Sequence, residues 1–464
     1  MSVFRDSILI GFSNIIVFIF SFFRSPILVR IFKFSPEIFG RFQYLMTILA
    51  TISSYSQFSL DTAYISERKT HSVIERRFFF SWFSLIVISL TCISLFIWSI
   101  ISKSRLLFFQ GIVLALPQIL FSAISTNIRD EKRFDLLSLS RIINTFASTL
   151  IVIISAILIP DENSLIISTS ISMVICFIFL AKKTKWNYTK IKLDKSYITN
   201  FVKSNYGFIL FQTGSFMLNR FSSNSPIFFI KKLFDDKILG FYSIAHRLLL
   251  VTGDIWSSAL SEVFLPYFSK SEEDERKIFH NFLLSSSVMF LLYFAVSALS
   301  DYYINILFGT DFMAVSPIIR ILNPWLFSAI VVGPYTSAFP VHRKTGTNLL
   351  INIFLIFGRI GALLLGSIWN YRASLIFFSI VGVIFNDFML ILSFRYARIS
   401  FYSALLVMIL NQLSLFALNF QSPIYLFGYP SIIINCIILH QRRNILKNYI
   451  SKFGFLSKIS KFSK

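Results

Sequence analysis

Acidic residues, cysteines and charges of any kind are scarce in this chain of 464 residues. It has 22 Asp and Glu against 44 Lys and Arg, and charged residues make up only 14% of the total. The three cysteines lie inside apolar runs, so no disulfide framework is expected. Walker A, HExxH and GxSxG motifs are absent, and the five histidines lack metal-ligand spacing. From these absences, the sequence is expected to have no catalytic centre, no metal site and no cofactor.

Apolar residues dominate what is there. They make up 55% of the chain, and the mean hydropathy is +0.71. They fall in runs of about 20 residues, the length that crosses a bilayer as a helix. The pattern predicts an all-α polytopic membrane protein with about 14 spans. The expected spans are 8–33, 37–60, 78–101, 106–127, 136–159, 165–181, 205–230, 238–264, 279–300, 313–339, 347–368, 373–393, 402–419 and 424–440.

The basic residues predict how the chain crosses the membrane. With a cytoplasmic N-terminus, 29 of the 44 Lys and Arg fall in segments on the cytoplasmic side, where such residues concentrate. Both termini are therefore expected on the cytoplasmic side of the membrane. The net charge of +22 is spread over short clusters and forms no stripe, so a nucleic-acid partner is not expected. The first apolar run is interpreted as a membrane helix and not as a cleaved signal.

A faint internal repeat predicts two similar halves. Two short patterns recur at one spacing of 200 residues: Ser25-Pro26-Ile27 as Ser225-Pro226-Ile227, and Ile38-x-Gly40-x-Phe42 as Ile238-x-Gly240-x-Tyr242. Six spans precede the basic segment 182–203, so both halves would insert the same way round, with a pseudo-two-fold axis along the membrane normal. The expected parts are an N-terminal six-helix lobe (1–181), a cytoplasmic linker (182–203), a C-terminal six-helix lobe (204–395), an extra helix pair (396–440) and a basic cytoplasmic tail (441–464).

Arginines inside the apolar runs are the candidate substrate ligands. A charge at bilayer depth is costly and usually faces a cavity or a partner. Guanidinium binds phosphate or carboxylate through two hydrogen bonds, so an arginine-lined cavity would suit a pyrophosphate. For Arg24 and Arg220, snorkelling toward the interface is the alternative role, whereas Arg359 lies too near the middle of its span to snorkel easily. The cavity candidates are Arg24, Arg220, Arg247 and Arg359, whereas Arg141 and Arg320 are also explained as anchors near span ends.

Two acids and two prolines complete the candidate set. Asp254 and Asp387 lie deepest in the apolar runs, where each could bind a coupling ion, H⁺ or Na⁺, or form a structural ion pair. Pro26 and Pro226 are expected to kink the first helix of each lobe, because proline removes a backbone hydrogen bond. Paired helix breaks are typical of binding regions in duplicated transporters.

Several stretches resemble one transporter family. They are PEIFGRF at 36–42, RDEKRF at 129–134, LGFYSIAHRL at 239–248, VFLPYFS at 263–269 and ILFGTDF at 306–312. The chain is similar to the Wzx-type O-antigen and oligosaccharide flippases, which share a superfamily with MATE multidrug exporters and lipid II flippases.

The resemblance implies two lobes around a central cavity. It also implies transfer of an undecaprenyl-pyrophosphate-linked oligosaccharide between leaflets by alternating access. A polysaccharide polymerase and other assembly proteins are the implied candidate partners.

Two other functions are compatible with a polytopic chain. An O-antigen polymerase or ligase would carry a large outside loop with catalytic residues, and the expected outside loops are short. A small-molecule exporter of the MATE type would favour an acidic or aromatic cavity, and the candidates here are arginines.

Overall fold

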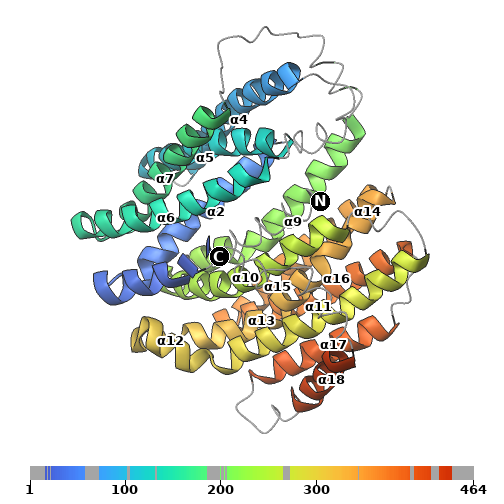
Figure 1. Cartoon of the computed structure of the whole chain (residues 1–464). Coiled ribbons are helices and arrows are strands. Elements are labelled where there is room, and N and C mark those ends of the chain that lie inside the picture. Colours follow the sequence, from blue (N-terminus) through green and yellow to red (C-terminus); the bar gives the residue numbers. More distant parts are fainter. Residues whose placement is uncertain are drawn as a thin grey trace, which may run out of the picture. The chain divides into compact units, whose positions relative to one another are not determined.

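The structure is a computed structural model. It describes residues 16–17, 19–20, 22–57, 73–101, 105–130, 133–184, 199, 203, 206–264, 272–342, 344–397, 402–419 and 428–441. Every regular element in these residues is a helix, mostly of α type (Figure 1). The chain divides into two compact units. The first comprises 1–244, 307–312 and 345–371, and the second comprises 245–306, 313–344 and 372–464.

The first unit is built from helices that pack in a chain of neighbours. α6 lies against α7, α4 and α5 lie against each other, and α9 lies along α15 and α2. Its helices are residues 22–32, α2 (Pro36–Gln57), α4 (Val73–Ile101), α5 (Arg105–Asp130), α6 (Phe134–Leu158), α7 (Glu162–Thr184), α9 (Tyr206–Leu233), the start of α10 (Asp236–Phe264) and α15 (Thr345–Ser367).

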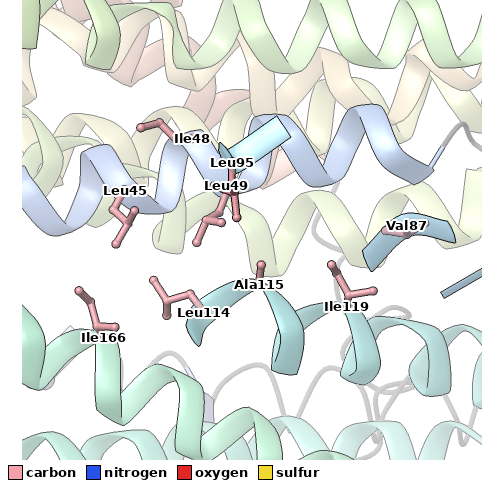
Figure 2. Close-up of a cluster of buried hydrophobic side chains, with 9 residues drawn as sticks. All are labelled: Leu45, Ile48, Leu49, Val87, Leu95, Leu114, Ala115, Ile119 and Ile166. Carbon is pink, nitrogen blue, oxygen red and sulfur yellow. The ribbon is translucent and has the colours of Figure 1, made fainter. Parts of the chain in front are cut away.

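An aliphatic core joins four of these helices. Figure 2 shows its nine buried side chains, which come from α2, α4, α5 and α7. They are Leu45, Ile48, Leu49, Val87, Leu95, Leu114, Ala115, Ile119 and Ile166. None of them has a polar group, so dispersion contacts and close packing hold this part of the unit together.

The second unit surrounds one enclosed helix, α13 (Val315–Val332). Of the apolar segment Thr310–Thr336, which contains α13, 83% is buried inside the protein. The corresponding share for Asp135–Leu158 in α6 is 28%. α11 packs against α13, α17 and α18, and α17 packs against α18 (Figure 1). The other helices of the unit are the rest of α10, α11 (Glu272–Ala298), most of α12 (Ser300–Phe308), α14 (Ala338–Val341), α16 (Tyr371–Tyr396), α17 (Tyr402–Ala417) and α18 (Gly428–Gln441).

The predicted membrane spans are confirmed as helices. Each expected span from the second to the fourteenth coincides with a helix within several residues, and the first overlaps the helix at 22–32. In the described part of the chain, seven helices are long and apolar enough to cross a membrane, and three shorter apolar helices accompany them. The protein is therefore an all-α polytopic membrane protein. The lobe boundaries and the pseudo-two-fold axis stay predictions, and most of the 182–203 linker lies outside the described residues.

Helix starts in the first unit carry the residue types that favour them. α2 begins with Pro36 and has Glu37 in its first turn, where a fixed φ and a negative charge both suit a helix N-terminus. α10 is capped by Asp235, whose Oδ1 accepts a hydrogen bond of 2.6 Å from the backbone N–H of Ile238. These starts lie 200 residues apart, so the two copies of the repeat fold into the same local structure.

Candidate functional site

Arg24 connects the first helix to two others in its unit. Its Nη1 donates to Ser148 Oγ on α6 (3.4 Å), and its Nη2 donates to Ser168 Oγ on α7 (3.1 Å). Each serine donates its own hydroxyl proton to a carbonyl one turn back, that of Thr145 or Leu165. The serine oxygens therefore have lone pairs available for the guanidinium. The side chain of Arg24 is half-buried.

Arg359 makes a similar connection deeper in the same unit. It lies on α15, is only 2% exposed, and its Nη1 reaches Ser222 Oγ (3.2 Å) and Ser223 Oγ (3.5 Å) on α9. About two turns earlier on the same two helices, Asn352 Nδ2 on α15 donates to Ser215 Oγ on α9 at 2.9 Å. The serine hydroxyls are neutral, so these bonds orient the guanidinium without cancelling its charge.

The two arginine–serine connections occupy matching places in the predicted halves. Arg24 lies on the first helix of one half and reaches Ser148, the fifteenth residue of the fifth helix, α6. In the other half, the fifteenth residue of α15, the fifth expected span, is Arg359, and it reaches back to Ser222 on α9, the first expected span. In each predicted half, one arginine therefore connects the first and fifth expected spans, and the two arginines are placed on opposite helices.

The other two candidate arginines have different surroundings. Arg220, on α9, has an exposed side chain. Arg247, on α10, is half-buried and belongs to the second unit. Its neighbour His246 stacks on the ring of Trp325 with centroids 5.9 Å apart. The structure thus places Arg24, Arg220 and Arg359 in one unit and Arg247 in the other.

The structure describes the side chains of one candidate acid, Asp387, and of both candidate prolines. Asp387, on α16, is half-buried, and its Oδ1 accepts a hydrogen bond of 2.7 Å from Gln412 Nε2 on α17. The side chain of Asp254 lies outside the described residues. Pro26 and Pro226 are buried, and the helices at 22–32 and α9 continue on both sides of them. The described residues contain no group of three or more His, Cys, Asp or Glu that could hold a metal ion.

Uncharged amides are the polar residues that the sequence reasoning missed. In the second unit, Asn411 Nδ2 donates to Ser286 Oγ (3.3 Å), and Asn435 Nδ2 donates to Asn411 Oδ1 (2.7 Å). Asn386 Nδ2 donates to Ser328 Oγ at 2.7 Å. An amide inside an apolar run is the sequence signal for such a residue. Its polar groups need hydrogen-bond partners within the membrane, as a charge does.

Comparisons with known proteins agree on polysaccharide biosynthesis. The chain is 25% identical over 200 residues to the amylovoran biosynthesis protein AmsL of Erwinia amylovora, covering 42% of this chain and 49% of that protein. It is 23% identical over 343 residues to the capsular polysaccharide biosynthesis protein CapF of Staphylococcus aureus, covering 70% of this chain and 82% of that protein. The chain therefore spans about half the length of the first relative and most of the second.

The fold is that of known membrane transporters. The structure of the lipid II flippase MurJ in an inward closed conformation matches with a TM-score of 0.68 and 15% identity, covering 95% of this chain and 99% of that one. An inward-facing multidrug resistance MATE family transporter of the MOP superfamily matches with a TM-score of 0.58 and 12% identity, covering 87% and 99%. At these identities the comparisons with solved structures establish the fold. Because the polysaccharide biosynthesis protein family matches residues 27–317, more than half of the sequence, the chain belongs to that family.

Proposed function

We propose that the protein is a flippase for an undecaprenyl-pyrophosphate-linked oligosaccharide, an O-antigen or similar polysaccharide repeat unit. Substrate would pass from the cytoplasmic to the outer leaflet by alternating access. The observation that carries the proposal is the family match over residues 27–317. It is supported by relatives named for capsule and amylovoran synthesis and by the fold shared with a lipid II flippase.

The arginines supply the chemistry that such a substrate needs. A pyrophosphate has several anionic oxygens, and a guanidinium can donate two parallel hydrogen bonds to a pair of them. Arg24 and Arg359 are held in place by serines, which would lower the entropy lost when they bind substrate. Arg220 is exposed and Arg247 is half-buried, and both are proposed to attract the head group. Asp387 and Asp254 are proposed to bind the coupling ion, H⁺ or Na⁺.

The cellular setting follows from the same proposal. The protein would lie in the bacterial inner membrane with both termini in the cytoplasm, where the sugar unit is assembled on its lipid. On the outer side it would supply the substrate of a polysaccharide polymerase, whose reaction needs the lipid-linked unit in that leaflet.

The direct test is flipping by purified protein in proteoliposomes. A fluorescent undecaprenyl-pyrophosphate-linked oligosaccharide would be placed in both leaflets, and a membrane-impermeant quencher would report the fraction that becomes accessible. We expect complete quenching with the protein and about half without it. Arg359→Ala should abolish flipping and Arg359→Lys should retain part of it, because a lysine keeps the charge but not the paired donors. Gly361→Ala, on the same helix, meets no atom within 4 Å and is the matched control.

A different substrate class would give a different result. If the sugar lipid stays in its leaflet while a small organic cation such as ethidium is exported against its gradient, the flippase proposal is wrong. The MATE-like exporter would then be the better description.

A further inference from the structure

Pro324 interrupts the hydrogen bonding of α13 in the second unit. A proline has no backbone N–H, so the carbonyl of Arg320, one turn earlier, loses its partner within the helix. Asn419, which follows α17, supplies a replacement, because its Nδ2 donates to that carbonyl oxygen at 3.1 Å. The side chain of Arg320 is held separately by Asp301, on α12. The break in α13 is therefore capped by a side chain from outside the helix.

The residue before the break connects α13 to α10 through α11. Asn323 is fully buried, and its Nδ2 donates to the backbone oxygen of Tyr293 at 2.8 Å and to Ser297 Oγ. The hydroxyl of Tyr293 donates in turn to the backbone oxygen of Leu249 on α10 at 2.7 Å. Gly253 allows this approach, since a Cβ there would lie 2.7 Å from Tyr293 Oη. Asn323 therefore holds the backbone of α10 through one intermediate residue.

The residue after the break contacts α10 directly. Trp325 stacks on the ring of His246, with centroids 5.9 Å apart and ring planes 16° from parallel. The indole also meets Phe378 on α16 edge to face, with centroids 4.8 Å apart. A Cβ atom on Gly382, one turn further along α16, would collide with the indole ring. Trp325 is only 2% exposed, so its ring is fixed between α10 and α16.

The two contacts with α10 lie on either side of Arg247. His246 precedes this arginine by one residue, and Leu249 follows it by two. A rotation or bend of α10 at Arg247 would have to break the stack with the indole or the hydrogen bond from α11. Arg247 and all of these contacts belong to the second unit. The direction in which α10 presents the arginine therefore depends on the shape of α13 at its break.

We propose that the break at Pro324 positions Arg247 for the anionic head group of the substrate. The positioning residues are Asn323, Trp325 and Asn419. The inference rests on the proposed function, in which Arg247 attracts the pyrophosphate. A charged side chain that is already oriented loses less entropy when it binds. The extra helix pair then supports transport through its packing, because Asn419 lies in the connection between α17 and α18.

A double-mutant cycle tests the cap without any substrate. In Pro324→Ala the new backbone N–H can donate to the Arg320 carbonyl, so the Asn419 amide is no longer needed. Asn419→Ala should therefore lower the unfolding temperature of the parent protein and leave that of the Pro324→Ala protein nearly unchanged. Leu413→Ala, on α17 with a side chain 61% exposed, is the control and should have little effect in either background. Equal losses from Asn419→Ala in the two backgrounds would overturn the cap.

Flipping kinetics in proteoliposomes test the positioning. Trp325→Leu should raise the KM for the lipid-linked oligosaccharide about tenfold with little change in kcat, as Arg247→Ala should, because a misdirected arginine binds the head group less well. Added to Arg247→Ala, it should have almost no further effect. Trp325→Phe keeps a ring against His246 and should retain most of the affinity. Trp369→Leu, at a tryptophan 66% exposed, is the control and should leave KM unchanged.

The outcomes separate positioning from stability and from the proposed function. If Trp325→Leu does not fold, Asn419→Ala takes its place in the same cycle with Arg247→Ala. Effects on KM that multiply would show that these residues do not act through Arg247, and would overturn the inference. If the parent protein flips no sugar lipid, the proposed function is wrong and the positioning for that substrate falls with it, while the unfolding cycle still decides the cap.

Discussion

Serine hydroxyls decide how firmly the buried arginine of α15 is held. Ser222 accepts from Arg359 Nη1 at 3.2 Å, whereas Ser223 is at the long limit of 3.5 Å. Ser222→Ala would remove the better of these two acceptors from a buried charged donor, at a cost of about 1–3 kcal/mol. Thermal unfolding of the purified protein measures this cost. Ser223→Ala should cost clearly less, and Ser367→Ala, at an exposed serine bonded to its own helix, should cost almost nothing. Equal losses in all three variants would contradict the geometry.

The pair of Asp301 and Arg320 gives the protein a pH-dependent contribution to stability. Burial acts to raise the pKa of Asp301, but hydrogen bonds and charge from Arg320 outweigh it and hold that pKa below its usual 3.8. The two oxygens accept from Nη1 at 2.8 Å and Nη2 at 3.4 Å. Because folding favours the ionised form, the contribution is complete above about pH 4 and is lost as pH falls through the folded-state pKa.

The corresponding variant is Asp301→Asn. The carboxyl side chain is 55% exposed, so solvent screening limits the loss at pH 7 to about 0.2–1 kcal/mol. The difference in unfolding temperature between Asp301→Asn and the parent should be present at pH 7 and shrink below pH 4. Asp311→Asn, at an exposed acid in the turn Thr310–Phe312, is the control. A difference that stays constant from pH 7 to pH 3 would show that charge pairing is not its cause.

Single charged residues could be predicted from the sequence, but their partners could not. A charge inside an apolar run draws attention to Arg359 because of the cost of burying it. Nothing in the sequence distinguishes Ser222 from the many other serines in this chain. Its partnership depends on how α9 and α15 rotate against each other, which tertiary packing decides.

The extra helix pair α17 and α18 is fixed to the second unit by polar contacts. Asn411 connects Ser286 on α11 with Asn435 on α18, and Ser414 Oγ donates to Ser431 Oγ at 2.6 Å. All of these side chains are buried. These buried bonds favour a packing role for the pair.

Asn411→Ala tests that conclusion. Interhelical hydrogen bonds in membrane proteins contribute about 0.6 kcal/mol on average and up to about 1.7 kcal/mol, so losing two should lower the unfolding free energy by about 1–2 kcal/mol. Leu413→Ala, on the same helix with a side chain 61% exposed, should have a much smaller effect. The measurement is thermal or denaturant unfolding in detergent. A larger loss for Leu413→Ala than for Asn411→Ala would mean that lipid-facing contacts hold the pair.

Helix positions were the most predictable elements, because a bilayer sets the length of an apolar run. α6 and α7, for example, agree with the expected spans within about three residues, less than the uncertainty of such boundaries. Helix faces were less predictable. In α4 and α5, apolar side chains occur both among the buried residues and among the exposed ones, so hydrophobic periodicity cannot show which side meets lipid and which meets Leu95 or Leu114.

For the complete chain, the repeat and the orientation depend on each other. Six spans before Lys190 would put both halves the same way up. Only then would Gly40 and Gly240, each of which lies against the first residue of the other's helix, lie at the same membrane face. Lys190 itself lies outside the described residues. Reporter fusions at Lys190 and at the C-terminus should both report the cytoplasm, and a reporter inserted at Pro160, between α6 and α7, should report the outside.

The outcome at Lys190 has the widest consequence. A fluorescent protein is fluorescent there only if the position is cytoplasmic, whereas a phosphatase is active only if it is outside. With the N-terminus in the cytoplasm, phosphatase activity at Lys190 would mean an odd number of spans before it, and hence inverted halves related by an axis in the membrane plane. The starts of α2 and α10 would then begin at opposite faces of the membrane. Since Gly40 and Gly240 touch each other's helices at those starts, that topology is incompatible with the structure, and cytoplasmic fluorescence at Lys190 is the expected result.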